Sequence, residues 1–99
     1  MLQLYDQKPI SIFLNDDDQK IRIQFCNIKM KMKMCQFRHF NQYLLRLSSE
    51  IEQDTDVVDL LLVRDSLNVS ISLNHFFQLS HAVALVMAEK FENNKIILN

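Results

Sequence analysis

Two stretches of alternating apolar and polar residues are followed by a change of spacing. Residues 20–25 and 28–34 alternate with period two, which predicts strands because successive side chains of a strand point to opposite faces. Cys26 and Asn27 between them predict a two-residue hairpin turn, since Asn tolerates positive φ. The apolar spacing then changes to three and four residues, which predicts a helix with one buried face. The members of that face are Phe37, Phe40, Leu44, Leu47 and Ile51.

The same succession of patterns recurs when residues 20–52 are aligned with residues 59–91. Asp65-Ser66 then takes the place of the hairpin turn, and Asn74 is the expected N-cap of a second helix. The identical pairs are only Phe37 with Phe76 and Glu50 with Glu89, so an internal duplication and two independent ββα units both remain open. The expected buried stripe of the second helix is Phe76, Leu79, Val83 and Val86, with Ala82, Met87 and Phe91 beside it.

Two further segments flank the paired units. Residues 9–15 predict an extra strand, and Asn15 to Asp18 form its turn into the next. Ile96 to Leu98 predict a short strand at an edge. The expected fold class is therefore α+β, with one antiparallel sheet of about five strands and two helices on one face. The chain, residues 1–99, is expected to form a single domain.

Composition excludes several classes of function. The apolar fraction of 48% is that of a globular protein rather than a disordered one. The chain has no glycine, so the glycine-dependent Walker A, Rossmann and nucleophile-elbow motifs are absent. The N-terminus does not resemble a signal peptide, and the longest apolar run, Ala82 to Ala88, is too short to span a membrane. Cys26 and Cys35 are expected to be free thiols, which favours a cytoplasmic location.

Basic residues gather in one region although the net charge is only −1. With Phe25 and Ile28 flanking the hairpin turn, Arg22 is expected opposite Lys31 on the outward face. Such a face is either simply solvated, a surface for a protein partner, or a surface for a polyanion such as nucleic acid. Phe13 is the only ring expected near it, which disfavours nucleic acid. The candidate surface consists of Lys20, Arg22, Lys29, Lys31 and Lys33, with Lys20 expected opposite Lys33.

The second hairpin is expected to expose apolar residues. If Leu60 and Leu62 face inward, the outward positions of the same strand predict a dimer surface. The alternative is that the N-terminal segment, with Leu2, Leu4 and Tyr5, folds over this strip. The candidate dimer surface consists of Val57, Asp59, Leu61 and Val63.

Residue patterns for catalysis or metal binding are weak. His75 and His81 are spaced for different faces of a helix, and the two cysteines fit no zinc spacing. Asp16, Asp17 and Asp18 lack the alternating ligands and the glycine of a calcium loop, which favours a solvated turn. We therefore expect no catalytic residue, metal, cofactor or small-molecule ligand.

The stretch IQFCNIKMKM leading into FRHFNQYL resembles short bacterial domains of unknown function, in which a hairpin precedes an F-x-x-F helix. The likeness covers about a third of the chain, and it implies a small cytoplasmic bacterial protein without an assigned activity. The function predicted from the sequence is a non-catalytic protein-interaction module that forms a homodimer through the outer sheet face or an edge, with no membrane partner. The alternative is weak binding of nucleic acid through the basic hairpin face.

Overall fold

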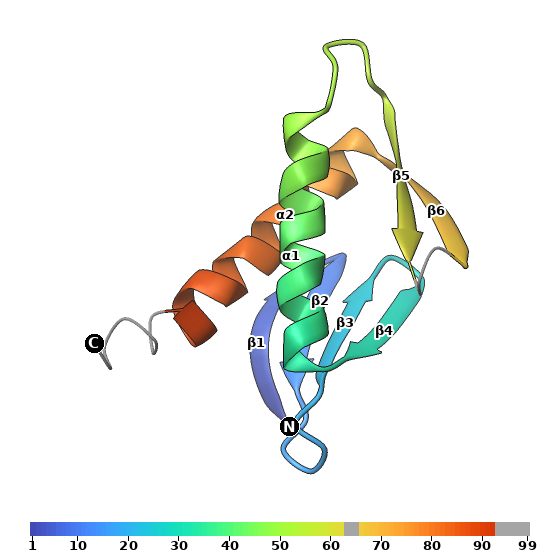
Figure 1. Ribbon diagram of the computed structural model, residues 1–99. Helices are drawn as coiled ribbons and strands as arrows, with labels where there is room; N and C mark the ends of the chain where they lie inside the picture. Colours follow the sequence, from blue (N-terminus) through green and yellow to red (C-terminus); the bar gives the residue numbers. More distant parts are fainter. Residues whose placement is uncertain (63–65, 93–99) are drawn as a thin grey trace.

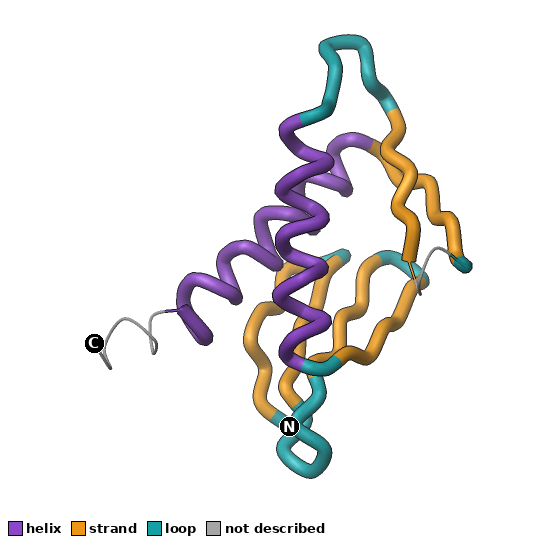
Figure 2. The backbone as a smooth tube through the Cα atoms, viewed as in Figure 1, coloured by secondary structure: helices purple, strands orange, loops and turns teal. Residues whose placement is uncertain are grey.

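The computed structural model describes residues 1–62 and 66–92 (Figures 1 and 2). It is an α+β fold, and the predicted order of strand, strand and helix occurs twice. Whether this order reflects a duplication stays a hypothesis. The elements are β1 (Leu2–Gln7), β2 (Ile10–Leu14), β3 (Ile21–Phe25), β4 (Ile28–Met32), α1 (Met34–Ser49), β5 (Val57–Leu62), β6 (Leu67–Ser72), α2 (Leu73–Val86) and the π-helical η1 (Met87–Glu92).

The first hairpin has the predicted register. Phe25 pairs with Ile28, and Arg22 pairs with Lys31 in the antiparallel ladder of β3 and β4. The turn begins at Cys26, whose φ of 54° lies in the left-handed region. The predicted extra strand is β2, which pairs with β3 on its other side. The period-two pattern therefore fixed both the pairing and the face of each side chain in this hairpin.

The N-terminal segment forms a strand that the sequence analysis missed. β1 pairs antiparallel with β2, so the first sheet has the order β1-β2-β3-β4. Leu4 and Tyr5 pack against the hydrophobic core from this position. The suggestion that the N-terminal segment folds over the second hairpin is therefore wrong, because β1 is held at the far edge of the first sheet by its pairing with β2.

The prediction of one five-stranded sheet is also wrong, because β5 and β6 form a separate two-stranded sheet. Both sheets contribute to one core, so burial does not require them to be hydrogen bonded to each other. The ladder of β5 and β6 closes at Leu62 and Leu67. The turn predicted at Asp65-Ser66 falls partly outside the described residues, and the strand predicted at Ile96 to Leu98 falls wholly outside them.

The transition from β4 to α1 occurs earlier than predicted. Lys33 is the N-cap of α1 and Met34 its first residue, so neither belongs to the strand. The Lys33 N–H donates to Gln36 Oε1 at 2.7 Å, which satisfies one of the backbone donors at the start of the helix. The predicted pairing of Lys20 with Lys33 is therefore absent, since the ladder ends at Ile21 and Met32.

Ser72, rather than the predicted Asn74, is the N-cap of α2. Its Oγ accepts the His75 N–H at 3.1 Å, and the helix begins at Leu73. We expect Ser72→Ala to lower the free energy of unfolding by about 1 kcal/mol, because this capping bond is lost. Asn74→Ala should leave it nearly unchanged. Urea denaturation followed by circular dichroism measures both, and a larger loss for Asn74→Ala would contradict the assigned cap.

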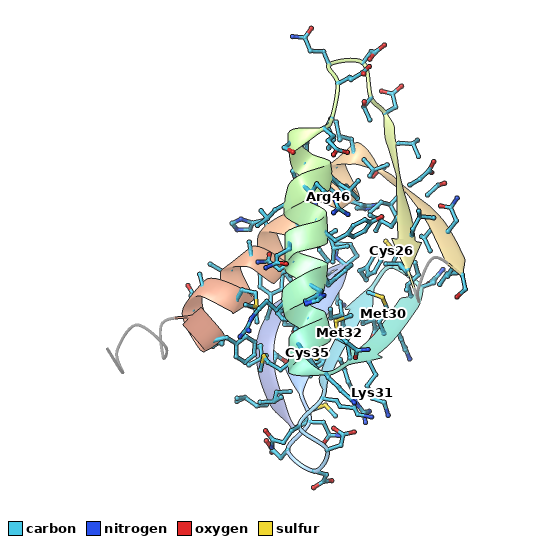
Figure 3. All side chains as sticks on the ribbon, viewed as in Figure 1. Cys26, Met30, Lys31, Met32, Cys35 and Arg46 are labelled. Atoms are coloured by element: carbon cyan, nitrogen blue, oxygen red, sulfur yellow. The ribbon has the colours of Figure 1, made fainter. Side chains whose placement is uncertain are left out.

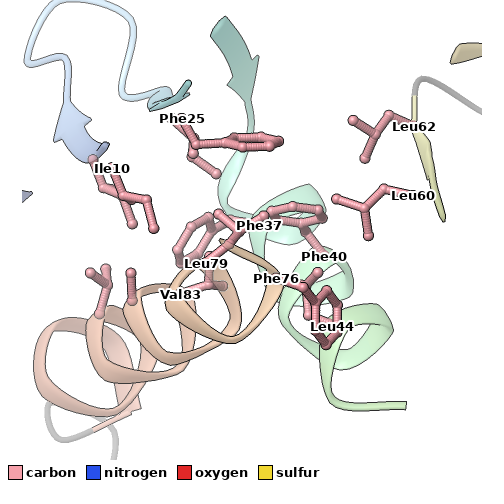
Figure 4. Close-up of a cluster of buried hydrophobic side chains, with 14 of the residues drawn as sticks. Ile10, Phe25, Phe37, Phe40, Leu44, Leu60, Leu62, Phe76, Leu79 and Val83 are labelled. Atoms are coloured by element: carbon pink, nitrogen blue, oxygen red, sulfur yellow. The ribbon is translucent and has the colours of Figure 1, made fainter. Parts of the chain in front are cut away.

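The core lies between the two helices and the two sheets (Figure 4). Phe37 and Phe76, one from each helix, are fully buried, which agrees with the predicted helix faces. Phe91 of η1 packs edge-on against Phe37, with ring centroids 6.0 Å apart. The two sheets supply the remaining walls through inward-facing residues, among them Ile10, Ile23, Phe25, Val58, Leu60 and Leu62.

Candidate binding surfaces: an open sheet face and a free strand edge

The first sheet has one face toward the helices and one face toward solvent. Met30 and Met32 lie on the α1 side of β4, whereas Lys31 lies on the opposite side (Figure 3). The strand registers place the outward residues in two rows that cross the sheet. We call this side of the sheet the basic face. Its first row consists of Gln3, Phe13, Arg22 and Lys31, and its second row consists of Asp6, Ser11, Gln24 and Lys29.

The basic face contains a depression with a volume of about 420 Å³. This volume falls within the range of small-molecule sites, roughly 300–1,000 Å³. The side chains that line the depression include Phe13, Arg22, Gln24, Lys29 and Lys31, together with Met1. Three cationic side chains and one aromatic ring therefore border the same depression.

Arg22 lies in the middle of the basic face and is only loosely neutralised. Its Nη2 is 3.8 Å from Asp18 Oδ2, and both side chains are partly exposed. The Arg22 Nε is buried, and no acceptor within the described residues reaches it. Lys20 lies just before β3 and Lys33 lies at the helix start, so the structure brings together three of the five predicted cations, namely Arg22, Lys29 and Lys31.

The direct pairing of Arg22 with Lys31 has an expected cost in stability. We expect Lys31→Gln to raise the free energy of unfolding by about 0.2–1 kcal/mol, because like charges opposite each other repel. The gain should shrink as salt is added. Lys29→Gln is the matched control, since Lys29 pairs with the neutral Gln24. Thermal unfolding at low and high salt tests this, and equal gains from the two variants would contradict the pairwise repulsion.

The outward residues of β5 are exposed as predicted, but they form a small apolar surface. The exposed fractions of Val57 and Leu61 are 55% and 45%. Asp59 lies between them and accepts a hydrogen bond from Ser70 Oγ of the paired strand. Val63, the fourth predicted member, lies outside the described residues. The apolar strip is thus interrupted by a carboxylate that is engaged within its own hairpin.

The backbone of β6 has a free edge, which the sequence analysis did not identify. The Leu61 N–H donates to Tyr43 Oη at 2.9 Å and thus points away from β6. Leu61 and Asn68 therefore form a pair without mutual hydrogen bonds. The same holds for every second pair, so the N–H and C=O groups of Asn68, Ser70 and Ser72 point away from β5. Within the described parts of the chain no hydrogen bond from a turn, loop or cap reaches the backbone of Asn68 or Ser70, whereas Ser72 is already the N-cap of α2.

The edges of the two sheets differ in how they are protected against pairing. β1 contains a bulge between Gln3 and Tyr5, and β4 carries Lys29 and Lys31. The side chain of Tyr43 from α1 occupies the edge of β5 at Leu61. Bulges, lysines and covering elements are the usual protections of an edge strand. β6, with the sequence LNVSIS, has no charged residue, no proline and no bulge in its register with β5.

The structure also brings together a cysteine and a histidine that are far apart in sequence. Cys26 Sγ lies 4.0 Å from His75 Nδ1, at the start of α2. No sequence spacing indicates this contact, because it depends on the packing of the first turn against the second helix. Cys26 and Cys35 are both exposed free thiols, as expected. In the described residues no third side chain is found bonded to His75, so the pair lacks the orienting group typical of nucleophilic catalysis.

No match appears among protein-family models, curated proteins or solved structures. Within residues 1–62 and 66–92, no group of three or more His, Cys, Asp or Glu side chains is arranged to hold a metal ion. No helix in the described residues has the length and apolar character needed to cross a membrane.

Proposed function

We propose that this protein is a non-catalytic interaction module that forms a homodimer by pairing β6 with β6 of a second copy. The observation that supports it is the free edge of β6, which carries no charged residue and no bulge in its register with β5. An edge of this kind is a template for pairing with another strand. In a homodimer each copy covers the edge of the other, so neither edge remains open to further association.

A two-fold axis determines the geometry of such a dimer. When a two-fold axis relates two antiparallel strands, one residue of the first strand lies opposite the same residue of the second copy. Because the backbone groups of Ser70 point outward from the middle of β6, Ser70 of one copy would exchange two hydrogen bonds with Ser70 of the other. Asn68 would then pair with Ser72 of the second copy. The joined sheet would have the strand order β5-β6-β6-β5.

The edge is favoured over the outer face of the hairpin as the dimer surface. The face offers Val57 and Leu61, but β6 contributes only Asn68, Ser70 and Ser72 to it. Pairing through the face would also place the Asp59 carboxylate, which accepts a hydrogen bond from Ser70, inside the interface. Edge pairing leaves the hydrogen bond from Ser70 to Asp59 intact and satisfies backbone groups that otherwise depend on water.

Light scattering over a concentration series tests the proposal. We expect the mass to rise from 11.8 kDa to twice this value and then to remain constant, because each chain has one free edge of this kind in its described part. The association should depend little on salt, since no ion pair contributes to it. A mass of 11.8 kDa at all concentrations would contradict the homodimer and leave another protein's strand as the partner of β6.

A further inference from the structure

We propose that the basic face of the first sheet binds single-stranded nucleic acid, with a base stacked on Phe13 and phosphates held by Arg22, Lys29 and Lys31. This inference is independent of the proposed dimer, because the face and the β6 edge belong to different sheets. It assigns a ligand to a depression that the interaction through β6 does not use.

The ring and the cations are direct neighbours across three strands. Phe13 of β2 pairs with Arg22 of β3, which pairs with Lys31 of β4. Residues paired in this way have Cβ atoms about 4.5–5.5 Å apart. Binding of single strands relies on this combination, because an aromatic ring stacks on a base while basic side chains follow the backbone. The cations could be expected on one face from the alternation of β3 and β4, whereas the place of Phe13 in the same row depends on the register of β2 against β3.

The shape of the depression suits a chain rather than an enclosed ligand. All its lining residues except Met1 come from β2, β3 and β4, so the depression lies within one sheet surface. A bound strand could continue beyond it in both directions. Lys29 and Lys31 lie two residues apart on the same side of β4, which separates them by about 6.6 Å along the strand. Two cations spaced in this way can contact successive phosphates.

The acidic residues near the basic face leave its cations available. Asp6 accepts a hydrogen bond from Ser11, and Asp16 lies 3.4 Å from the N-terminal amine. Asp18 is the acid that pairs with Arg22 among the described residues, at 3.8 Å. The buried Arg22 Nε has no acceptor in the described residues. A phosphate could therefore approach the guanidinium without displacing a short ion pair.

A single strand fits the face better than a duplex or an acidic peptide. A duplex keeps its bases stacked on one another, so it cannot offer a base to Phe13. An acidic peptide would use the three cations but would leave the ring without a role. The distinction can be tested because the ring and the cations can be substituted separately.

Fluorescence anisotropy with a labelled oligo-deoxythymidylate measures the binding. We expect the wild-type chain to bind it at low salt with a Kd of roughly 1–100 µM, weakening steeply as salt rises. Lys31→Gln should weaken binding several-fold and reduce the salt slope by about 0.7, because one phosphate contact is lost. Arg38→Gln is the matched control for net charge: it removes an exposed cation from α1 and should leave the Kd unchanged.

The aromatic contribution needs a separate pair of variants. Phe13→Leu keeps the apolar side chain but removes the flat ring, and it should raise the Kd roughly fivefold or more. Phe77→Ala removes a ring from α2 that is 47% exposed, and it should have no effect. Absence of wild-type binding at low salt, equal losses from Lys31→Gln and Arg38→Gln, or tighter binding of a duplex would each overturn the proposal. Unchanged binding of Phe13→Leu together with competition by polyglutamate would instead identify an acidic peptide site.

Discussion

Replacing Ser70 with proline is expected to convert the dimer into a monomer. Proline has no backbone N–H, so the central hydrogen bonds between the two β6 strands cannot form. The ladder within one chain should survive, because the Ser70 N–H points away from β5 and proline is tolerated at the outer edge of a sheet. Sedimentation equilibrium at a concentration where the wild-type chain is dimeric should give a mass of 11.8 kDa for the variant.

Ser70→Ala is the matched control for this substitution. It also loses the hydrogen bond from Ser70 Oγ to Asp59, but it keeps the outward N–H. We therefore expect Ser70→Ala to remain dimeric. A second edge variant, Asn68→Lys, adds a charge of the kind that protects β4 and should also weaken the dimer without an altered backbone. Folded Ser70→Pro that remains dimeric would show that β6 is not the interface.

Truncating Phe37 to alanine is expected to lower the free energy of unfolding by about 3–5 kcal/mol. Phe37 is fully buried and contacts Phe91 in an edge-on arrangement, so its removal leaves a cavity where α1 meets η1. Since a domain of this size is typically stable by only about 5–15 kcal/mol, the variant should be partly unfolded near physiological temperature. Urea denaturation followed by circular dichroism measures the loss.

The corresponding control is Phe77→Ala, whose ring is 47% exposed. It should cost roughly 1 kcal/mol or less, although Phe77 contacts Phe76. All variants should be compared at one protein concentration, because dimerisation stabilises the folded state by mass action. A loss for Phe37→Ala no larger than that for Phe77→Ala would contradict the position assigned to Phe37.

The first hairpin could be predicted in detail because several local signals agree there. Alternation on both strands specifies which residues face the core, and Asn27 in a two-residue turn determines which pairs oppose each other. A slip of one residue would expose Ile21 and Ile23, both of which are buried. Helix faces were predicted for the same reason, since Phe37 and Phe76 each begin a regular apolar stripe.

The division into two sheets could not be predicted in this way. Alternation identifies the buried side of a strand, but it does not identify the neighbour that binds the strand's edge. β5 buries Leu60 and Leu62 against the helices whether or not it pairs with β4. The helix starts were also misplaced. Lys33 and Met34 continue the alternation of β4, and Ser72 and Asn74 are both of residue types that favour the N-cap position.

The candidate surfaces also differ in how far they could be predicted from the sequence. Outward positions of one hairpin follow from its period, so Arg22, Lys29 and Lys31 were placed correctly on one face. Adding Phe13 to their row required the register of β2 against β3. The free edge of β6 depends on which described elements lie beside it, and the covered edge of β5 depends on the contact of Leu61 with Tyr43. Neither is visible in local sequence.

Amide hydrogen exchange, measured residue by residue at low and high protein concentration, tests the proposed dimer most directly. We expect the amides of Asn68 and Ser70 to become protected as the mass doubles. The amides of Lys29 and Lys31 lie on β4, at an edge of the first sheet, and point away from β3. They should continue to exchange quickly, and they serve as an internal control. Protection of Lys29 and Lys31 instead, or unchanged exchange at Asn68 and Ser70 in a protein of doubled mass, would contradict pairing through β6.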